Sequence, residues 1–78
     1  MTYLEKLRAN IGAELGRRGL HHKEAADALG VSKGTFSAKL HGRSPFNLAE
    51  LVQLATWLSI PFSTLVDGFD DADELVAA

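Results

Sequence analysis

The chain has 78 residues, a length that suffices for one domain with a modest core and leaves no room for a catalytic cleft between two domains. Its lack of cysteine excludes disulfides and thiolate metal sites, and no stretch has the apolar character of a signal peptide or membrane span, so a cytoplasmic protein is expected. The net charge of −2 conceals a division, because residues 1–66 hold eight basic and five acidic residues whereas residues 67–78 hold five acidic residues and no basic one. A basic body of this kind is compatible with phosphate binding.

The first predicted helix runs from Tyr3 to Arg18. Thr2 and Glu5 have the spacing of a capping box at its start. Apolar residues then recur at helical intervals and form a predicted inward face, at Leu4, Leu7, Ile11 and Leu15. Arginines suit the negative end of the helix, and Gly19 suits the position just past that end.

Two short helices follow, with a two-residue corner between them. The alanine-rich segment 23–29 is predicted to be helical, and Gly30 suits a left-handed turn after it. Ser32 has the position of a cap for a helix from Lys33 to His41, and Gly42 ends that helix. A connection of Gly30 and Val31 alone indicates a helix-turn-helix.

The remaining predicted elements are a loop, a longer helix and a last helical turn. Pro45 favours a loop over residues 43–46, and Asn47 with Glu50 repeats the capping-box spacing. The helix that follows ends near Leu58, and its predicted buried face consists of Leu48, Leu51, Val52, Ala55 and Leu58. Pro61 begins the last turn. We therefore expect an all-α domain of five helices over residues 1–66 and an acidic C-terminal tail over residues 67–78. The tail is expected to be either a frayed helix or disordered. Its expected role is that of a solubilising end or the start of a linker.

Residues 20–66 resemble the lambda-repressor and Cro type of helix-turn-helix domain, also called the XRE-like family. The string that carries the resemblance is LHHKEAADALGVSKGTFSAKLHGRSPFNLAELVQLATWLSIP. Its shared features are Ala26, the turn Gly30-Val31-Ser32, the run Thr35-Phe36-Ser37, and Gly42 at the end of the third helix. The resemblance implies a five-helix lambda-repressor-like fold and a transcriptional regulator, by expectation a repressor, that binds double-stranded DNA.

The third helix is the expected reading element, because a major groove about 12 Å wide admits one helix. Phe36 and Leu40 fall on its predicted inner side. On its outer side, the resemblance assigns base reading to Lys33, Gly34, Ser37 and Ala38. Only two of these four side chains are polar, so the readout is expected to be sparse. Gly34 either permits close approach of the backbone to DNA or is a neutral residue of the first turn.

Contacts to the DNA backbone are expected from the elements that flank this helix. His22 and Lys23 stand at the start of the second helix, whereas Arg43 and Ser44 stand in the loop after the third. These four residues are predicted to position the protein on phosphates, and Thr35 adds a further contact.

Two features depart from the family's pattern. Many relatives have an arginine and a glutamate at the positions of Leu15 and Leu40, and we expect a buried Leu15–Leu40 contact to replace that ion pair. Relatives commonly have an apolar residue where this chain has Lys39. Lys39 is expected to be a solvated surface charge or, less simply, a phosphate contact.

Histidines are the candidates for a metal or pH-sensing site, because His21, His22 and His41 all lie on the predicted DNA side. The adjacent pair lacks the i, i+4 spacing of helix-borne ligands, so surface or phosphate-contacting histidines are expected instead. No arrangement of nucleophile, base and oxyanion site can be assembled. We expect no enzyme activity, no metal or other cofactor and no small-molecule ligand.

A protein-docking module of the same fold, of the antitoxin or antirepressor type, is the alternative function, with the acidic tail engaging a basic partner. Leu54 and Trp57 are predicted to form an exposed apolar patch opposite the buried face of the fourth helix. We expect this patch to join two copies in a homodimer, at least on DNA. The simpler alternative is that Trp57 packs under the C-terminal segment near Phe62.

Overall fold

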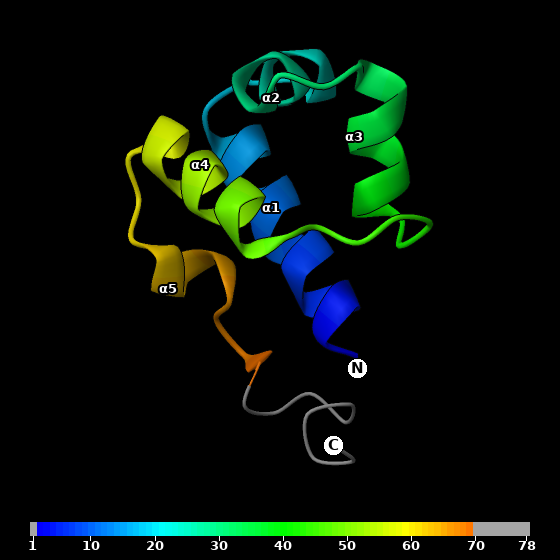
Figure 1. The fold of residues 1–78 in the computed structure, drawn as a ribbon. Coiled ribbons are helices and arrows are strands. Elements are labelled where there is room, and N and C mark those ends of the chain that lie inside the picture. Colours follow the sequence, from blue (N-terminus) through cyan, green and yellow to red (C-terminus); the bar gives the residue numbers. More distant parts are fainter. Residues whose placement is uncertain (1, 70–78) are drawn as a thin grey trace.

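The computed structural model describes residues 2–69, and the part of the predicted acidic tail over residues 70–78 lies outside the described residues. Within residues 2–69 the chain is all-helical, as predicted, with five helices: α1 (Tyr3–Arg17), α2 (His22–Leu29), α3 (Lys33–Leu40), α4 (Leu48–Leu58) and α5 (Phe62–Leu65). In Figure 1, α2 lies across the C-terminal end of α1, α3 descends from the α2 corner on one side, and α4 and α5 lie on the other side. Among the described residues, no helix is both long and apolar enough to span a membrane.

Local capping interactions begin three of the helices where they were predicted to begin. The Glu5 N–H donates to Thr2 Oγ1 at 3.1 Å, and the Thr35 N–H donates to Ser32 Oγ at 3.1 Å. Asn47 and Glu50 form the third predicted cap, which is a complete capping box. These bonds satisfy N–H groups that have no partner within the helix. They explain why short-range spacing located the starts of α1, α3 and α4.

The corner between α2 and α3 is a left-handed turn at Gly30, which has φ of 72°. The Val31 N–H reaches back to the Ala26 carbonyl at 3.0 Å and so satisfies the end of α2. Gly42 after α3 also has a positive φ, 84°, and a Cβ there would collide with the side chain of Leu4. The predicted helix-turn-helix is therefore present, and α3 ends against the start of α1.

One core joins all five helices. Its buried members are Leu7, Ile11, Leu15, Ala25, Ala26, Leu29, Phe36, Leu40, Leu54, Ala55, Leu58 and Leu65. The Phe36 ring is fully buried, and the rings of His22 and Phe46 meet it edge-on at centroid distances of 5.5 and 6.0 Å. Aromatic pairs prefer this edge-to-face geometry. The inner side predicted for α3, with Phe36 and Leu40, is confirmed.

The face of α4 that enters the core differs from the predicted one. Leu54 is fully buried, whereas Leu48 and Val52 are 67% and 47% exposed. Trp57 is half-buried and packs against the core. The prediction of an exposed Leu54–Trp57 patch is therefore wrong, and with it the dimer contact through Leu54. Apolar residues occur on all sides of α4, so periodicity alone could not select the buried face.

The C-terminal end of α3 is tied to the first half of α1. Arg8 Nε donates to the Leu40 carbonyl at 2.9 Å, and Gly42 lies against Leu4. Leu15 lies about two helical turns further along α1 than Arg8. Leu15 and Leu40 are both buried, as predicted, with 3% and 4% exposure, and both belong to the one core. Their direct contact stays a prediction.

Glu14 on α1 is buried although it is charged, with 4% of its surface exposed. Arg17 Nη1 donates to one of its carboxylate oxygens at 3.1 Å, and Arg18 pairs with the other. A buried charge is tolerated when it is paired in this way. The two arginines at the end of α1 therefore have a partner that helix-end preferences alone did not indicate.

The segment after α5 returns to α1. Asn10 Nδ2 donates to the carbonyl oxygens of Leu65 and Asp67 at 2.8 and 2.9 Å. The Phe69 ring meets the Tyr3 ring edge-on, with 5.7 Å between centroids. Residues 67–69 thus continue to pack on the helical body beyond the predicted boundary at residue 66.

Candidate nucleic-acid interface

The outer side of α3 presents small side chains. Lys33 and Gly34 are exposed, and Ser37 and Ala38 are half-buried beside them. All four predicted base-reading positions therefore lie at the surface of one helix. Small side chains allow the helix backbone to approach a flat or concave partner closely.

Thr35 is exposed on the first turn of α3, and its hydroxyl accepts a hydrogen bond from Ser32 Oγ at 2.9 Å. A hydroxyl can donate while it accepts, so the Thr35 hydroxyl keeps its own hydrogen for an external acceptor. This geometry suits the predicted phosphate contact. It also orients the hydroxyl before any partner arrives.

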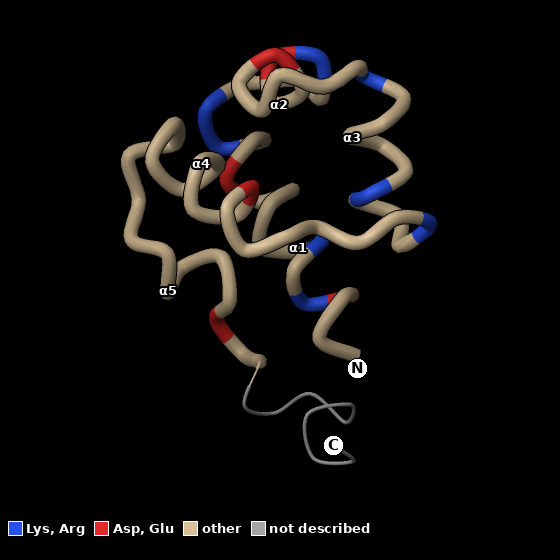
Figure 2. The backbone as a smooth tube through the Cα atoms, in the orientation of Figure 1, with Lys and Arg blue, Asp and Glu red and all other residues tan. Residues whose placement is uncertain are grey.

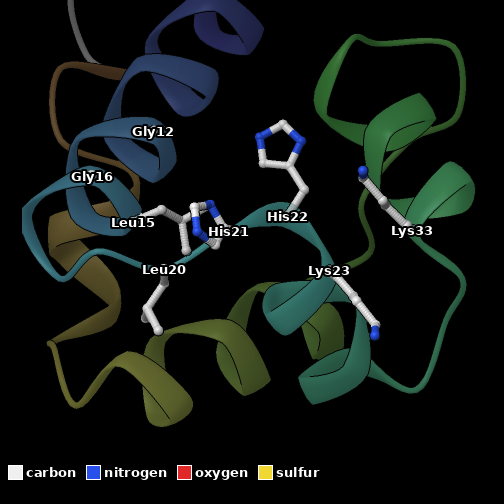
Figure 3. Close-up of a pocket in the computed structure, with 8 residues that line it drawn as sticks. All are labelled: Gly12, Leu15, Gly16, Leu20, His21, His22, Lys23 and Lys33. Carbon is white, nitrogen blue, oxygen red and sulfur yellow. The ribbon is translucent and has the colours of Figure 1, made fainter.

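An open hollow lies where α1, the start of α2 and the start of α3 meet (Figure 3). Its volume is about 480 Å³, and its lining consists of Gly12, Leu15, Gly16, Leu20, His21, His22, Lys23 and Lys33. In Figure 3 the Lys33 side chain extends toward the His22 ring, whereas Lys23 extends away. The structure thus brings Lys33, a predicted base reader, beside His22, a predicted phosphate contact.

Several features make this hollow suitable for an anion. Lys23 and Lys33 carry positive charge, and the N-terminal end of α2 adds the positive end of a helix dipole. His22 is half-buried and is held by its ring contact with Phe36. A side chain at Gly12 or Gly16 would point into open space, so the α1 side of the hollow is open.

The other end of α3 leads into the loop that holds Arg43 and Ser44. Arg43 is exposed, and its backbone N–H donates to the Ala38 carbonyl at 2.8 Å, which closes the helix. Ser44 is half-buried against an apolar pocket that Phe46 and Phe69 also line. Arg43 and Lys33 therefore stand at opposite ends of α3, with the small outer side chains between them.

Lys39 holds this loop in place and is not a solvated surface charge. Its Nζ donates to the Pro45 carbonyl and to Glu50 Oε1, both at 3.0 Å. The side chains of Lys39 and Glu50 are only 13% and 12% exposed. The predicted solvent or phosphate role of Lys39 is wrong, because its ammonium group is already engaged. The partner stands eleven residues away across the loop, and local spacing could not reveal it.

The surroundings of the Glu50 carboxyl change its pKa. Burial acts to raise the pKa of Glu50, but the Asn47 backbone N–H and the Lys39 ammonium group outweigh burial and hold it below the ordinary value of 4.5. The lowered pKa means that the ionised form stabilises the fold. Glu50 thus links the cap of α4 to the end of α3.

A model of the BetR domain matches residues 4–75 of the chain. The chain belongs to the BetR domain family. BetR domains are small helical DNA-binding domains of the helix-turn-helix type, which agrees with the α2–α3 unit and its exposed outer side. No significant match to a curated protein or to a solved structure was found. The finer resemblance to the lambda-repressor and Cro type stays a prediction.

Positive charge flanks α3 of this BetR domain. Figure 2 shows Lys or Arg at the start of α2, at the start of α3, at its end and in the following loop. Lys39, at the end of α3, is neutralised by Glu50, so Lys23, Lys33 and Arg43 are the exposed cations of these elements. Phosphates on the two sides of a DNA groove can contact cations arranged in this way.

The BetR domain does not bring its three histidines together. His21 and His22 line the hollow at the start of α2, whereas His41 caps the far end of α3. In the part of the chain that the structure describes, no group of three or more His, Cys, Asp or Glu side chains is placed to hold a metal ion.

Proposed function

We propose that this BetR domain is a sequence-specific transcriptional regulator of the lambda-repressor and Cro type, acting as a repressor in the cytoplasm. In this proposal α3 enters the major groove of double-stranded DNA, and two copies bind together as a homodimer. The function requires no catalytic group, cofactor or small-molecule ligand. Family membership supports DNA binding, and the geometry of α3 supports the particular mode.

The observation that carries the proposal is the shape and charge of α3. Its eight residues span about 12 Å, which equals the approximate width of the major groove. Exposed cations stand at both ends, Lys33 at the first turn and Arg43 in the loop beyond. A helix of this length fits within the groove, where Lys33 and the small outer side chains approach the bases and Arg43, in the loop beyond, comes near a phosphate backbone.

Base reading is assigned to the outer side of α3. A lysine at the helix start can donate to guanine O6 and N7, so Lys33 is the main proposed reader and Ser37 a weaker one. Gly34 and Ala38 have no side-chain group that can form a hydrogen bond with a base. Their small size permits close approach, and the Ala38 methyl group suits an apolar contact such as that with a thymine methyl.

Phosphate contacts are assigned to the two flanks. His22 and Lys23 act from the start of α2, where the helix dipole assists. Thr35 accepts a hydrogen bond from Ser32, so its own hydroxyl hydrogen can be donated to a phosphate oxygen. Arg43 and Ser44 act from the loop after α3. These contacts fix the register of the protein on DNA and carry no sequence information.

The homodimer is proposed to form through a different surface from the one expected at first, because Leu54 lies in the core. Leu48 and Val52 are exposed on a different side of α4 from Leu54, and Phe62 at the start of α5 is 36% exposed. Exposed apolar groups of this kind commonly mark interfaces. Two half-sites are then expected about 34–36 Å apart, or a multiple of that spacing.

Protein docking, in the manner of an antitoxin or antirepressor, is the second candidate. The exposed Leu48 and Val52 favour it as much as they favour a dimer, since an apolar surface does not specify its partner. The two functions differ in their dependence on Lys33 and Arg43, which docking through α4 does not need.

Selection of genomic DNA fragments by the purified chain tests the proposal. We expect enrichment of a pseudo-palindromic motif, and we expect a Lys33→Ala, Arg43→Ala double variant to lose that enrichment. Fragments retained without any shared motif contradict sequence-specific regulation. Failure to retain DNA even at low salt contradicts DNA binding and favours protein docking.

A further inference from the structure

His41 at the C-terminal end of α3 has a geometry that fixes one of its ring hydrogens. The residue is exposed, and its Nδ1 lies 2.8 Å from the Ser37 carbonyl oxygen one turn earlier. A carbonyl oxygen only accepts, so Nδ1 carries the hydrogen of this bond. In a neutral imidazole Nε2 is then an acceptor, and only the protonated ring can donate from both nitrogens.

The position of His41 places it at the edge of the proposed DNA contact. It follows Ser37 by four residues and Ala38 by three, so it shares their outer side of α3. Because α3 is about as long as the major groove is wide, His41, the residue that follows its last turn, lies at the margin of the groove, where phosphates stand. Arg43, a proposed phosphate contact, follows two residues later.

The charged groups around this end of α3 are mainly cations. From α1, Arg8 Nε donates to the Leu40 carbonyl, next to His41. From the loop, Arg43 is exposed. Lys39 of α3 and Glu50 of α4 neutralise each other. Arg8 and Arg43 thus supply positive charge at this end of α3, and an arriving phosphate supplies the opposite charge.

We propose that His41 is a phosphate ligand that acts only in its protonated form, so that DNA binding takes up a proton at this residue. Nδ1–H remains bonded to the Ser37 carbonyl, and Nε2, protonated from solvent, donates to a phosphate oxygen. This inference rests on the proposed function, because it presupposes that the end of α3 faces the DNA backbone. It adds a regulatory consequence, since affinity for DNA then rises as the pH falls.

The experiment measures DNA affinity by fluorescence anisotropy on a selected duplex, at fixed salt, between pH 5.5 and pH 8.5. Uptake of one full proton changes affinity by as much as tenfold per pH unit. His41→Gln, which keeps a neutral donor, is expected to lose the share of the pH slope that belongs to this residue. His41→Arg, a permanent cation, is expected to bind as tightly at pH 8 as the wild type does near pH 6.

Calorimetric titration in two buffers of different ionisation enthalpy counts the protons directly. On binding DNA, the wild type is expected to take up more protons than His41→Gln. His22→Gln, the matched change at the other end of the site, serves as the control. When both proteins carry His22→Gln, the difference in proton uptake between them is expected to stay the same. Thermal melting of each variant checks that it remains folded.

Equal pH slopes and equal proton uptake in the wild type and His41→Gln overturn this inference while leaving the proposed function intact. A loss of affinity in His41→Gln that is the same at every pH also overturns it, because a neutral ring then suffices. A wild-type protein that binds no duplex at any pH overturns both the inference and the proposed function.

Discussion

Lys39 Nζ and the Asn47 backbone N–H donate to the same oxygen of Glu50, each at 3.0 Å. The Lys39–Glu50 ion pair therefore connects the last turn of α3 to the N-terminal cap of α4. Lys39 also donates to the Pro45 carbonyl, so the loop between the two helices is held from both sides. The pair and the apolar core therefore both join α3 to α4.

Removal of one partner of the pair is expected to destabilise the domain. Lys39→Met leaves the Glu50 carboxylate largely buried without its cation, which should lower the free energy of unfolding by about 1–3 kcal/mol. Urea denaturation measures this loss. Glu50→Gln in the same background should cost less than it does alone, because the two residues interact. Strictly additive losses would show that the pair is not coupled.

Acid should weaken the contribution of Glu50. Its folded-state pKa is below 4.5, so the stabilisation is present above pH 4.5 and is lost as the pH falls through the lower folded-state value. The difference in unfolding free energy between the wild type and Glu50→Gln should therefore shrink from pH 7 to pH 3. Chemical denaturation at a series of pH values checks this, and a difference that stays constant contradicts the assigned ionisation.

Two leucines of α4 test which of its faces is buried. Leu54→Ala removes a fully buried side chain and should cost about 2–5 kcal/mol of stability. Leu48→Ala, the matched change at an exposed position of the same helix, should lie within about 0.5 kcal/mol of the wild type. Thermal or urea unfolding measures both. A reversed order of the two losses would mean that α4 is rotated relative to the structure.

Self-association should depend on the exposed side of α4. Replacement of Leu48 and Val52 by serine is expected to weaken the dimer without unfolding the monomer, because both side chains are exposed. Analytical ultracentrifugation with and without operator DNA measures the change. A protein that stays monomeric on DNA and protects a single half-site would exclude the proposed dimer.

Base reading and phosphate contact should separate when Lys33 and Arg43 are changed individually. Lys33→Ala is expected to cost about 1–3 kcal/mol on the cognate duplex and to relax base preference at one position. Arg43→Ala is expected to weaken cognate and random DNA alike and to reduce the salt slope by about one unit. Titrations on two duplexes at several salt concentrations provide the measurement.

Lys33 lines the same hollow as His22, a proposed phosphate contact. The two titrations therefore decide whether Lys33 contacts bases or phosphate. If Lys33→Ala weakens both duplexes equally, Lys33 acts on phosphate together with His22. If Arg43→Ala instead changes base preference, the assigned roles are inverted. If neither variant changes DNA binding, protein docking gains support.

Short-range patterns in the sequence determined the five-helix architecture of this BetR domain. The caps at Thr2, Ser32 and Asn47 bond to groups three residues away, so residue spacing alone located the starts of α1, α3 and α4. Gly30 needs a positive φ for the same local reason, and it marked the helix-turn-helix corner.

Only the tertiary structure decided which side of α4 enters the core, where Lys39 finds its partner and which groups share a hollow with Lys33. Apolar residues occur on all sides of α4, so its periodicity does not indicate which side is buried. The packing of neighbouring helices buries Leu54 and leaves Leu48 exposed. The Lys39–Glu50 pair forms across a loop, and the hollow joins side chains of three helices. Such contacts depend on how helices pack against one another, which spacing along a single helix does not encode.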